Sequence, residues 1–310
     1  MKFLKGIMFM LRSRGLAKGF KRLFFILERF GVTPRKHIRC LNHYIAILKK
    51  YNIKATFFIP ALIVNKYAGD IKTLDSAVIE WGIHADVHTD LSRLDKQTQE
   101  EHIKKAIQTF DRLGIVFSGF RAPYLKTNNN TQAVLAGQHR FEYDSSKTVL
   151  WDDIYGPGNS SYGWASMFYK FEKSTLNTVM PYKKDGILEI PVSLPDDDML
   201  FDRDKLTVKQ TGDIWIKMLK VCVRRNELFV LQLHPERIFE AEEALSRLIS
   251  EAQRSDPPVL ITTLRDIANL FNDNKLADKV WPEPYRAGLC ISGDIDSLTL
   301  LDFVDRLKKW

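Results

Sequence analysis

The stretch Ala287-Gly288-Leu289-Cys290-Ile291-Ser292-Gly293-Asp294-Ile295-Asp296 decides the fold that this chain is predicted to adopt. Its first five residues form an apolar run, which predicts a buried strand, and two aspartates follow at the carboxyl end. The plainer interpretation is a turn at Ser292-Gly293-Asp294 that merely ends the strand. Because barrel active sites assemble at the carboxyl ends of parallel strands, a strand here would deliver Asp294 and Asp296 to such a site.

The rest of the chain alternates between strand-like and helix-like periodicity from about residue 37 onward. Strands are predicted at residues 55–59, 77–86, 115–121, 141–144, 187–193, 228–233 and 259–262, and helices at 38–48, 97–113, 206–224, 240–252 and 264–271. This alternation predicts an α/β fold with a mostly parallel sheet, although a doubly wound sheet would show the same pattern. A distorted (β/α) barrel of about seven parallel strands is favoured because candidate catalytic groups follow several strands. Residues 145–186 show little periodicity, which predicts an irregular functional loop.

The charge of the chain is concentrated at its N-terminus. Residues 1–36 contain ten Lys or Arg and one acid, Glu28, so they carry +9, whereas the whole chain carries +8. The remaining body, residues 37–310, is close to neutral, which excludes a nucleic-acid-binding role for it. The basic, amphipathic arm has two open interpretations: peripheral contact with an anionic membrane surface, or helices packed on the outside of the barrel.

Composition also bears on where the protein is expected to act. The longest apolar run of the arm, residues 7–11, is too short for a secretion signal or for a ~20-residue membrane span. Three widely spaced cysteines form no zinc-ribbon pattern and indicate buried thiols in a reducing compartment. A cytoplasmic location is therefore expected, with peripheral attachment at the inner membrane face as the variant that the arm allows.

Two histidines four residues apart, His84 and His88, are the most direct candidates for metal ligands. This spacing places both imidazoles on one side of a helical turn or of an extended segment, so both can face one ion. Taken alone, such pairs are more often surface or capping residues. A further histidine, His234, follows the predicted strand at 228–233, where an isolated histidine would more often be structural.

Four segments occur in a particular order: Ala55-Thr56-Phe57-Phe58-Ile59-Pro60, His84-Ala85-Asp86-Val87-His88, Arg121-Ala122-Pro123-Tyr124 and Leu231-Gln232-Leu233-His234. In these motifs the chain resembles the polysaccharide deacetylase family (NodB homology, carbohydrate esterase 4). That family's paired aspartates precede the Ala-Thr-Phe-Phe strand, whereas no Asp occurs here before Asp70. The resemblance therefore implies a circularly permuted barrel over residues 37–310. Residues 286–296 would supply its first strand, parallel between the strands at 55–59 and 259–262.

The same resemblance implies a metal site and a general base. A divalent ion, expected to be zinc, would be held by His84, His88 and Asp296, and such a site leaves positions open for water and substrate. Asp294, the first acid of the pair, would be the general base. The guanidinium of Arg121 would hold this carboxylate ionised and oriented.

Two further roles follow from the resemblance. The backbone N–H of Tyr124 would bind the oxyanion, and His234 would protonate the leaving amine. Asp196, Asp197 and Asp198 are equal alternatives for the residue that orients His234. The segments Tyr143-Asp144-Ser145-Ser146 and Glu189-Ile190-Pro191-Val192-Ser193 also resemble barrel strands of relatives.

These residues lead to one functional hypothesis and two alternatives. The leading hypothesis is a metal-dependent hydrolase that removes an N-acetyl group from an amino sugar of a polysaccharide or of its cytoplasmic precursor. A hydrolase of another C–N amide bond on the same barrel is the first alternative, and a non-catalytic saccharide-binding member is the second. An N-acetylated saccharide is the expected partner.

Overall fold

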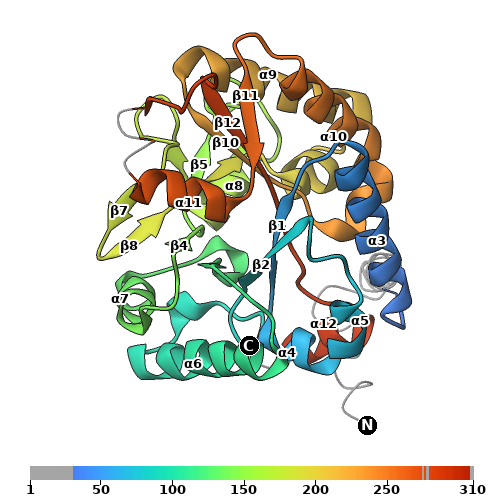
Figure 1. Cartoon of the computed structure of the whole chain (residues 1–310), viewed down its shortest axis with the longest axis vertical. Helices are drawn as coiled ribbons and strands as arrows, with labels where there is room; N and C mark the ends of the chain where they lie inside the picture. The colour runs from blue at the N-terminus through green and yellow to red at the C-terminus, as the bar shows by residue number, and fades with distance from the viewer. Residues whose placement is uncertain (1–30, 274–275, 277–278, 308–310) are drawn as a thin grey trace.

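The computed structural model describes residues 31–273, 276 and 279–307. A mostly parallel sheet lies at its centre, with its strands in the order β10-β12-β1-β2-β3-β4-β8-β7 and with β11 paired to β12 off this path (Figure 1). These strands are β1 (Ala55–Ile59), β2 (Ile79–Ile83), β3 (Gly119–Phe120), β4 (Tyr143–Asp144), β7 (Tyr182–Lys184), β8 (Ile187–Glu189), β10 (Leu228–Gln232), β11 (Val259–Thr262) and β12 (Ala287–Asp294). The β7–β8 pair is antiparallel. The predicted α/β class is confirmed.

The C-terminal strand β12 is fully buried and lies inside the sheet, parallel to its neighbours. One edge pairs with β10, from Leu228 opposite Gly288 to Gln232 opposite Ser292. The other edge pairs first with β11, over residues 287–290, and then with β1, over residues 292–294. The strand is therefore next to β1 as predicted, but its opposite neighbour is β10 and not β11. β11 is a parallel neighbour of β12 as predicted, but it shares one edge of β12 with β1, one beyond the other, so β12 does not lie between these two strands.

A second, three-stranded sheet consists of β5 (Thr148–Leu150), β6 (Glu172–Lys173) and β9 (Val192–Leu194). It lies against the free edge of β10, where the Val230 N–H donates to Ser193 Oγ at 3.2 Å. In the described residues the sheet is not closed by a continuous ladder of paired strands. The predicted mostly parallel sheet is confirmed, and only the closure of the barrel is not seen in the strand pairing of the described residues.

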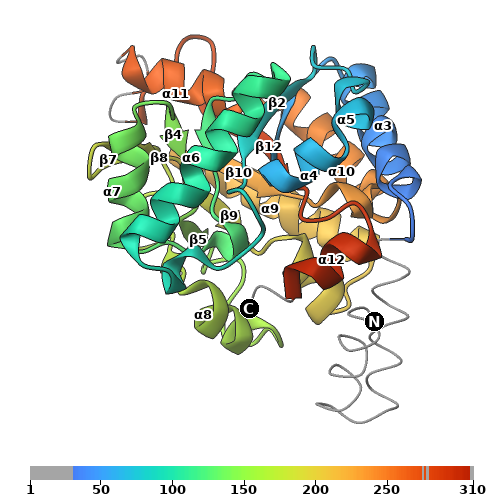
Figure 2. The ribbon, with the colours of Figure 1, turned by 90° about the horizontal axis from the view of Figure 1, so that it is seen from below.

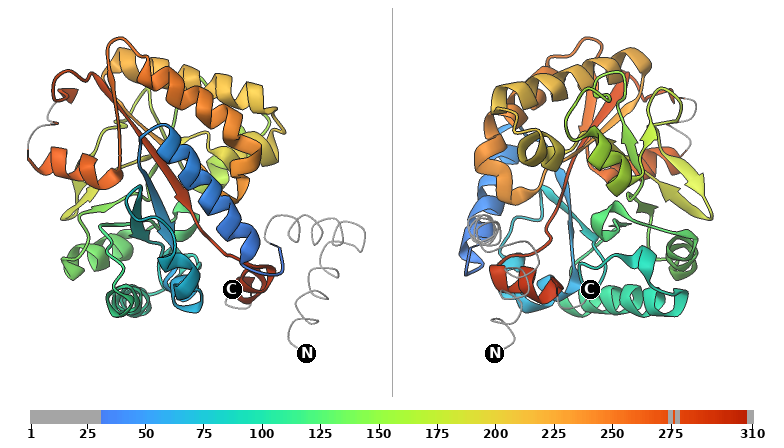
Figure 3. Two further views of the ribbon diagram at one scale, coloured as in Figure 1. Left: turned by 45° about the vertical axis from the view of Figure 1, so that its right-hand side comes forward. Right: turned by 180° about the vertical axis from the view of Figure 1, so that it is seen from behind.

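Helices cover the outside of the sheet (Figures 1 and 3). They are α3 (Arg35–Lys50), α4 (Ala61–Lys66), α5 (Ala68–Lys72), α6 (Lys96–Leu113), α7 (Asn129–Gln138), α8 (Tyr162–Tyr169), α9 (Val208–Arg225), α10 (Ile238–Gln253), α11 (Leu264–Asn272) and α12 (Leu300–Leu307), with short turns η1 (Leu91–Arg93), η2 (Pro123–Leu125), η3 (Asp198–Arg203) and η4 (Pro235–Arg237). Local caps set their ends: Asp95 accepts from the Thr98 N–H at the start of α6, and Gly114 ends it with φ 67°. No helix among the described residues is long and apolar enough to cross a membrane.

Residues 145–186 are not the irregular loop that was predicted. They contain β5, α8, β6 and β7, elements of two to eight residues whose periodicity is too short to be recognised. The predicted strands at 77–86 and 115–121 are shorter than expected: β2 ends at Ile83, three residues early, and β3 begins only at Gly119.

The C-terminal helix α12 lies beside the first described residues, and the Leu300 N–H donates to the Gly31 carbonyl at 2.8 Å. Figure 2 shows this end of the molecule, where α12, α4 and α8 are seen together. The predicted arm falls mostly on residues 1–30, outside the described residues, and its boundary at residue 36 lies inside α3. Its helical state and its contact with membranes stay predictions.

Candidate metal and catalytic site

The site is built where successive parallel strands end. The first residue beyond each strand still donates its backbone N–H to a carbonyl oxygen of the neighbouring strand. The five donor and acceptor pairs, at 2.8 to 3.1 Å, are His84 and Ile59, Arg121 and Ile83, Ser145 and Phe120, Leu233 and Ser292, and Ile295 and Phe58. The backbone of these residues is therefore as firmly held as that of the sheet. Their neighbours in sequence supply the polar side chains of the site, as expected for carboxyl ends of parallel strands.

Three of the predicted residues meet as a possible metal cluster: His84, His88 and Asp296. Their ligand atoms all lie within 4.8 Å of one another. Asp296 Oδ1 is 3.0 Å from His88 Nε2 and 3.7 Å from His84 Nε2. Two atoms that each lie about 2 Å from one ion are separated by roughly 3–4 Å, so this spacing fits a shared divalent ion. Both histidines are buried, and the Asp296 side chain is 13% exposed.

His84 is oriented by its second nitrogen. Nδ1 lies 2.7 Å from the Arg121 carbonyl oxygen, and because a carbonyl can only accept, Nδ1 carries the proton. The lone pair is then on Nε2, which faces Asp296 and has no hydrogen-bond partner among the described residues although it is buried. A buried nitrogen of this kind is suited to binding a metal ion. The segment between the two histidines is not helical, and Ala85 has a left-handed backbone with φ 62°.

Asp294 is held by a buried ion pair. Arg121 Nη1 donates to Asp294 Oδ1 at 3.0 Å, and Gln232 Nε2 donates to Oδ2 at 2.9 Å. Arg121 is fully buried and donates further to Ser145 and Ser292, with its guanidinium over the ring of Phe58 at 4.3 Å. The charges of Arg121 and Asp294 neutralise each other, and neighbouring polar groups form further hydrogen bonds with both side chains. A buried ion pair requires both conditions. Asp294 Oδ2 also lies 4.0 Å from His84 Nε2, so the carboxylate borders the metal cluster.

His234 is paired with Asp197, which settles the choice among the three consecutive aspartates. Its Nδ1 is 2.8 Å from Asp197 Oδ1, and its backbone N–H donates to Asp197 Oδ2 at 3.0 Å. Asp198 instead binds Arg237, and Asp196 accepts from the Tyr169 hydroxyl at 2.6 Å. Burial alone would lower the pKa of His234, but the charge and hydrogen bond of Asp197, with Glu236 and Asp198, raise that pKa well above its usual value.

Tyr124 lies against the metal cluster through its ring. The ring meets that of His88 edge-on at 4.4 Å between centroids and that of Phe168, on α8, at 6.3 Å. Its backbone is left-handed, with φ 61° and ψ 10°, which is rare for a bulky residue and is often found at functional sites. The predicted role of its N–H in binding an oxyanion stays a prediction.

Sequence reasoning missed the residues that hold the catalytic candidates in place. Gln232 and Ser292 were given no role, yet they bind Asp294 and Arg121 respectively. The period of two in a strand was the available signal, because it puts Gln232 on the face of His234 and Ser292 on the face of Asp294. Ser145 lay in a segment noted only for its resemblance, and no local pattern indicates that Arg121 would reach it.

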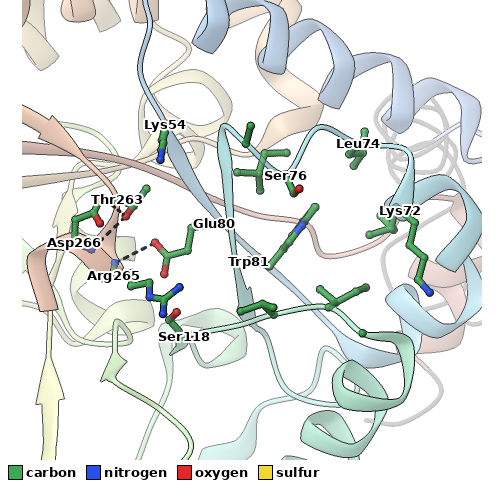
Figure 4. A pocket seen from close by; sticks show the side chains of 16 residues that line it. Lys54, Lys72, Leu74, Ser76, Glu80, Trp81, Ser118, Thr263, Arg265 and Asp266 are labelled. Carbon is green, nitrogen blue, oxygen red and sulfur yellow. Dashed lines mark hydrogen bonds between the residues drawn. The ribbon is translucent and has the colours of Figure 1, made fainter. Parts of the chain in front are cut away.

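Among the cavities on the described part of the molecule, one lies near the site. It has a volume of about 360 Å³ and is bordered by Leu125, Ser146 and Phe168 among others. A cavity of about 720 Å³ lies between α3, η3 and the start of α10. Another, of about 520 Å³, lies at the opposite end of the sheet, under the amino ends of β1 and β2, with Glu80 and Trp81 in its wall (Figure 4). No member of the metal cluster borders any of these three cavities, and the 360 Å³ cavity reaches the cluster only through the contacts of Phe168 with Tyr124 and of Tyr124 with His88.

Comparison with known proteins agrees with this geometry. Residues 39–142 match the family model "Polysaccharide deacetylase". A peptidoglycan deacetylase of Helicobacter pylori is 24% identical over 205 residues, which is 61% of this chain and 69% of that protein. A putative polysaccharide deacetylase from Mycobacterium smegmatis superposes with a TM-score of 0.61 at 23% identity, covering 81% of this chain and 82% of the other. An allantoinase superposes with a TM-score of 0.60 at 19% identity, covering 83% and 76%.

The comparisons do not confirm that the strand order is a circular permutation, which stays a prediction. The family match, the relatives and the mostly parallel sheet agree on the fold. Residues 39–142 carry the match to the polysaccharide deacetylase family, the NodB-homology group also called carbohydrate esterase 4, and the chain is similar in sequence and fold to members of that family.

Proposed function

We propose that this protein is a metal-dependent hydrolase that removes an N-acetyl group from an amino sugar. Similarity to a deacetylase family supports carbohydrate deacetylation in general. The observation that carries the specific proposal is the convergence of His84, His88 and Asp296 beside Asp294, a carboxylate already ion-paired to buried Arg121. These side chains come from strands far apart in the sequence and meet at one point.

The donor set fits a divalent ion such as zinc. It consists of two imidazole nitrogens and one carboxylate, and the buried Nε2 of His84 has its lone pair directed toward the cluster. When bound there, such an ion acts as a Lewis acid that polarises a carbonyl and lowers the pKa of water. Arg121 supports the ligand set indirectly, because its carbonyl fixes the tautomer of His84.

Asp294 is proposed as the general base that takes a proton from the attacking water. One of its oxygens is occupied by Arg121 and the other by Gln232, so the carboxylate is fixed in orientation before substrate arrives. Oδ2 is the oxygen that faces His84, and it is the atom proposed to accept the proton.

His234 is proposed as the general acid for the departing amine. Its pKa is raised well above the usual histidine value, chiefly by Asp197, so the imidazole is protonated near neutral pH. Nδ1 donates to Asp197, which leaves the Nε2 proton for the substrate nitrogen. His234 lies just beyond the end of β10, two residues after Gln232. Asp294 ends β12, which pairs with β10, so the base and the acid are anchored on adjacent strands.

The proposal is tested by acetate release from purified, zinc-loaded protein. The substrates are neutral N-acetylglucosamine oligomers and N-acetylglucosamine 1-phosphate, with one new primary amine expected for each acetate. Asp294→Asn is expected to lose about 10²–10⁴-fold in kcat, the usual contribution of a general base. Asp213→Asn, on the outer helix α9, is the control and retains the wild-type rate.

Two outcomes would favour the alternatives. Conversion of allantoin, or of another non-saccharide amide, without release of acetate from any amino sugar would indicate hydrolysis of a different C–N bond; the fold similarity to an allantoinase is the observation behind this choice. Tight zinc binding and saccharide binding without turnover of either substrate class would indicate a non-catalytic member.

A further inference from the structure

We propose that the cavity of about 360 Å³ beside the metal cluster is a subsite for an anionic group, a phosphate or a carboxylate, on the amino sugar. The inference rests on the proposed deacetylase function and specifies the chemical class of its substrate. The substrate would then be an N-acetylated sugar that carries a negative charge near the acetamide, rather than a neutral glycan.

The walls of this cavity come from four separate parts of the chain. They are η1, the segment after η2, the turn between β4 and β5, and the end of α8. Four of the lining residues are cations: Arg93, Lys126, Lys147 and Lys170. Two are acids, Asp90 and Glu172. Cations gathered from distant segments around one concave surface favour binding of an anion.

The two acids in the wall of the cavity do not neutralise all four of its cations. Asp90 Oδ2 lies 3.2 Å from Arg93 Nε and 3.7 Å from Lys126 Nζ, so two of the cations share one carboxylate. Lys147 and Lys170 form no ion pair within 4 Å in the part of the chain that the structure describes. Lys147 is half-buried and Lys170 is exposed. Lys147 also interacts electrostatically with the buried carboxyl groups of Asp144 and Glu189, so an incoming anion would meet the exposed ammonium group of Lys170 first.

The cavity adjoins the site through a continuous series of contacts. Phe168 borders the cavity, its ring meets Tyr124 at 6.3 Å, and the ring of Tyr124 meets His88 at 4.4 Å. On the other side Ser146 borders the cavity, and its Oγ accepts the Ala122 N–H at 2.8 Å. A sugar whose acetamide reaches the metal cluster can thus extend toward the cavity along Tyr124.

The side chains in the wall of the cavity suit a small anionic group. Lys126 Nζ lies 4.3 Å over the ring of Phe168, which restrains one cation at the wall without neutralising it. Lysine ammonium groups bind phosphate and carboxylate as point charges and do not require a fixed fork geometry. The surrounding charge thus selects for an anion but does not by itself choose between phosphate and carboxylate.

The test compares charged and neutral substrates on Lys147→Gln/Lys170→Gln, which removes two charges but retains the length of the side chains. The charged substrates are N-acetylglucosamine 1-phosphate and N-acetylmuramic acid, and the neutral one is di-N-acetylchitobiose. The ratio of kcat/KM for a charged over the neutral substrate is expected to fall about 10-fold or more, as charge-assisted contacts are lost. Whichever charged substrate shows the larger fall identifies the anion. Lys217→Gln, on the outside of α9, is the matched control and should leave the ratio unchanged.

Binding is measured separately so that it does not depend on turnover. Isothermal titration of the zinc-loaded Asp294→Asn protein with N-acetylglucosamine 1-phosphate should show affinity that falls with added salt and with the double lysine substitution. Such binding without acetate release by the wild type would refute the proposed reaction but support the anionic subsite. An equal loss for charged and neutral sugars, or binding of the charged sugars that is indifferent to both lysines, would overturn the subsite.

Discussion

Replacing Asp197 by Asn tests how the protein keeps His234 protonated. Asn has nearly the shape of Asp but no charge, and Asp197 is the nearest negative group to the His234 imidazole, at 2.8 Å with both side chains buried. A negative charge in hydrogen-bond contact stabilises the imidazolium, so removing it lowers the pKa of His234. Burial also opposes the imidazolium, so the pKa of His234 should fall to its usual value of 6.5 or below.

This fall has a measurable consequence for catalysis. If the pKa of His234 drops to about 6.5, roughly one tenth of the imidazole remains protonated at pH 7.5, so kcat there should fall about 10-fold. The basic limb of the pH profile should move to lower pH, and part of the activity should return as pH is lowered. NMR titration of the His234 ring gives the same pKa without turnover.

The control must separate the effect of Asp197 on the pKa of His234 from its effect on the ion pairs of Arg237. Asp197 also lies 3.1 Å from Arg237 Nε, so its replacement weakens that ion pair as well. Asp202→Asn removes another partner of Arg237 but makes no contact with His234, and it should leave the pH profile in place. An unmoved basic limb and an unmoved NMR titration in Asp197→Asn would show that Asp197 does not set the pKa of His234.

Three further perturbations follow from the same structure. Substitution His88→Ala should remove bound zinc, measured by elemental analysis, and should cancel the fall in Tm that a chelator causes in the wild type; equal zinc in both proteins would exclude the site. Gly293→Ala would place a Cβ 2.3 Å from the Leu233 carbonyl oxygen and should destabilise by about 1–3 kcal/mol in urea unfolding, whereas Gly69→Ala, with nothing within 4 Å, should not. Burial raises the pKa of Asp144 from 3.8 to about 6, so the folded protein binds more protons than the unfolded chain and stability is lost as pH rises between these values. Asp144→Asn should suppress this loss, by up to ~3 kcal/mol at pH 8 relative to pH 4, and an unchanged pH dependence in the metal-free protein would contradict the burial argument.

The sequence by itself determined the fold class and indicated which strands lead into the site, although the bounds of several strands differ from those predicted. Alternating periodicities arise from residues a few positions apart, so they are legible without tertiary information. The apolar run before Asp294 and the short motifs around His84 and Arg121 are also local, and they indicated residues that the structure brings together. The oxyanion role of Tyr124 and the permuted strand order remain predictions from resemblance.

Only the tertiary structure decided which residues touch. The opposite neighbour of β12 depends on hydrogen-bond pairing with a strand 60 positions away, β10, rather than with β11, which is 28 positions away, and β10 and β11 have equally apolar sequences. Asp197 could not be chosen over Asp196 or Asp198, because three consecutive carboxylates have the same chemistry and differ only in direction. The cationic cavity is likewise invisible in sequence, since Arg93, Lys126, Lys147 and Lys170 are separated by 77 positions and share a surface only after the strands have paired. Local pattern determines the elements of this protein, whereas side-chain contacts depend on how those elements pack.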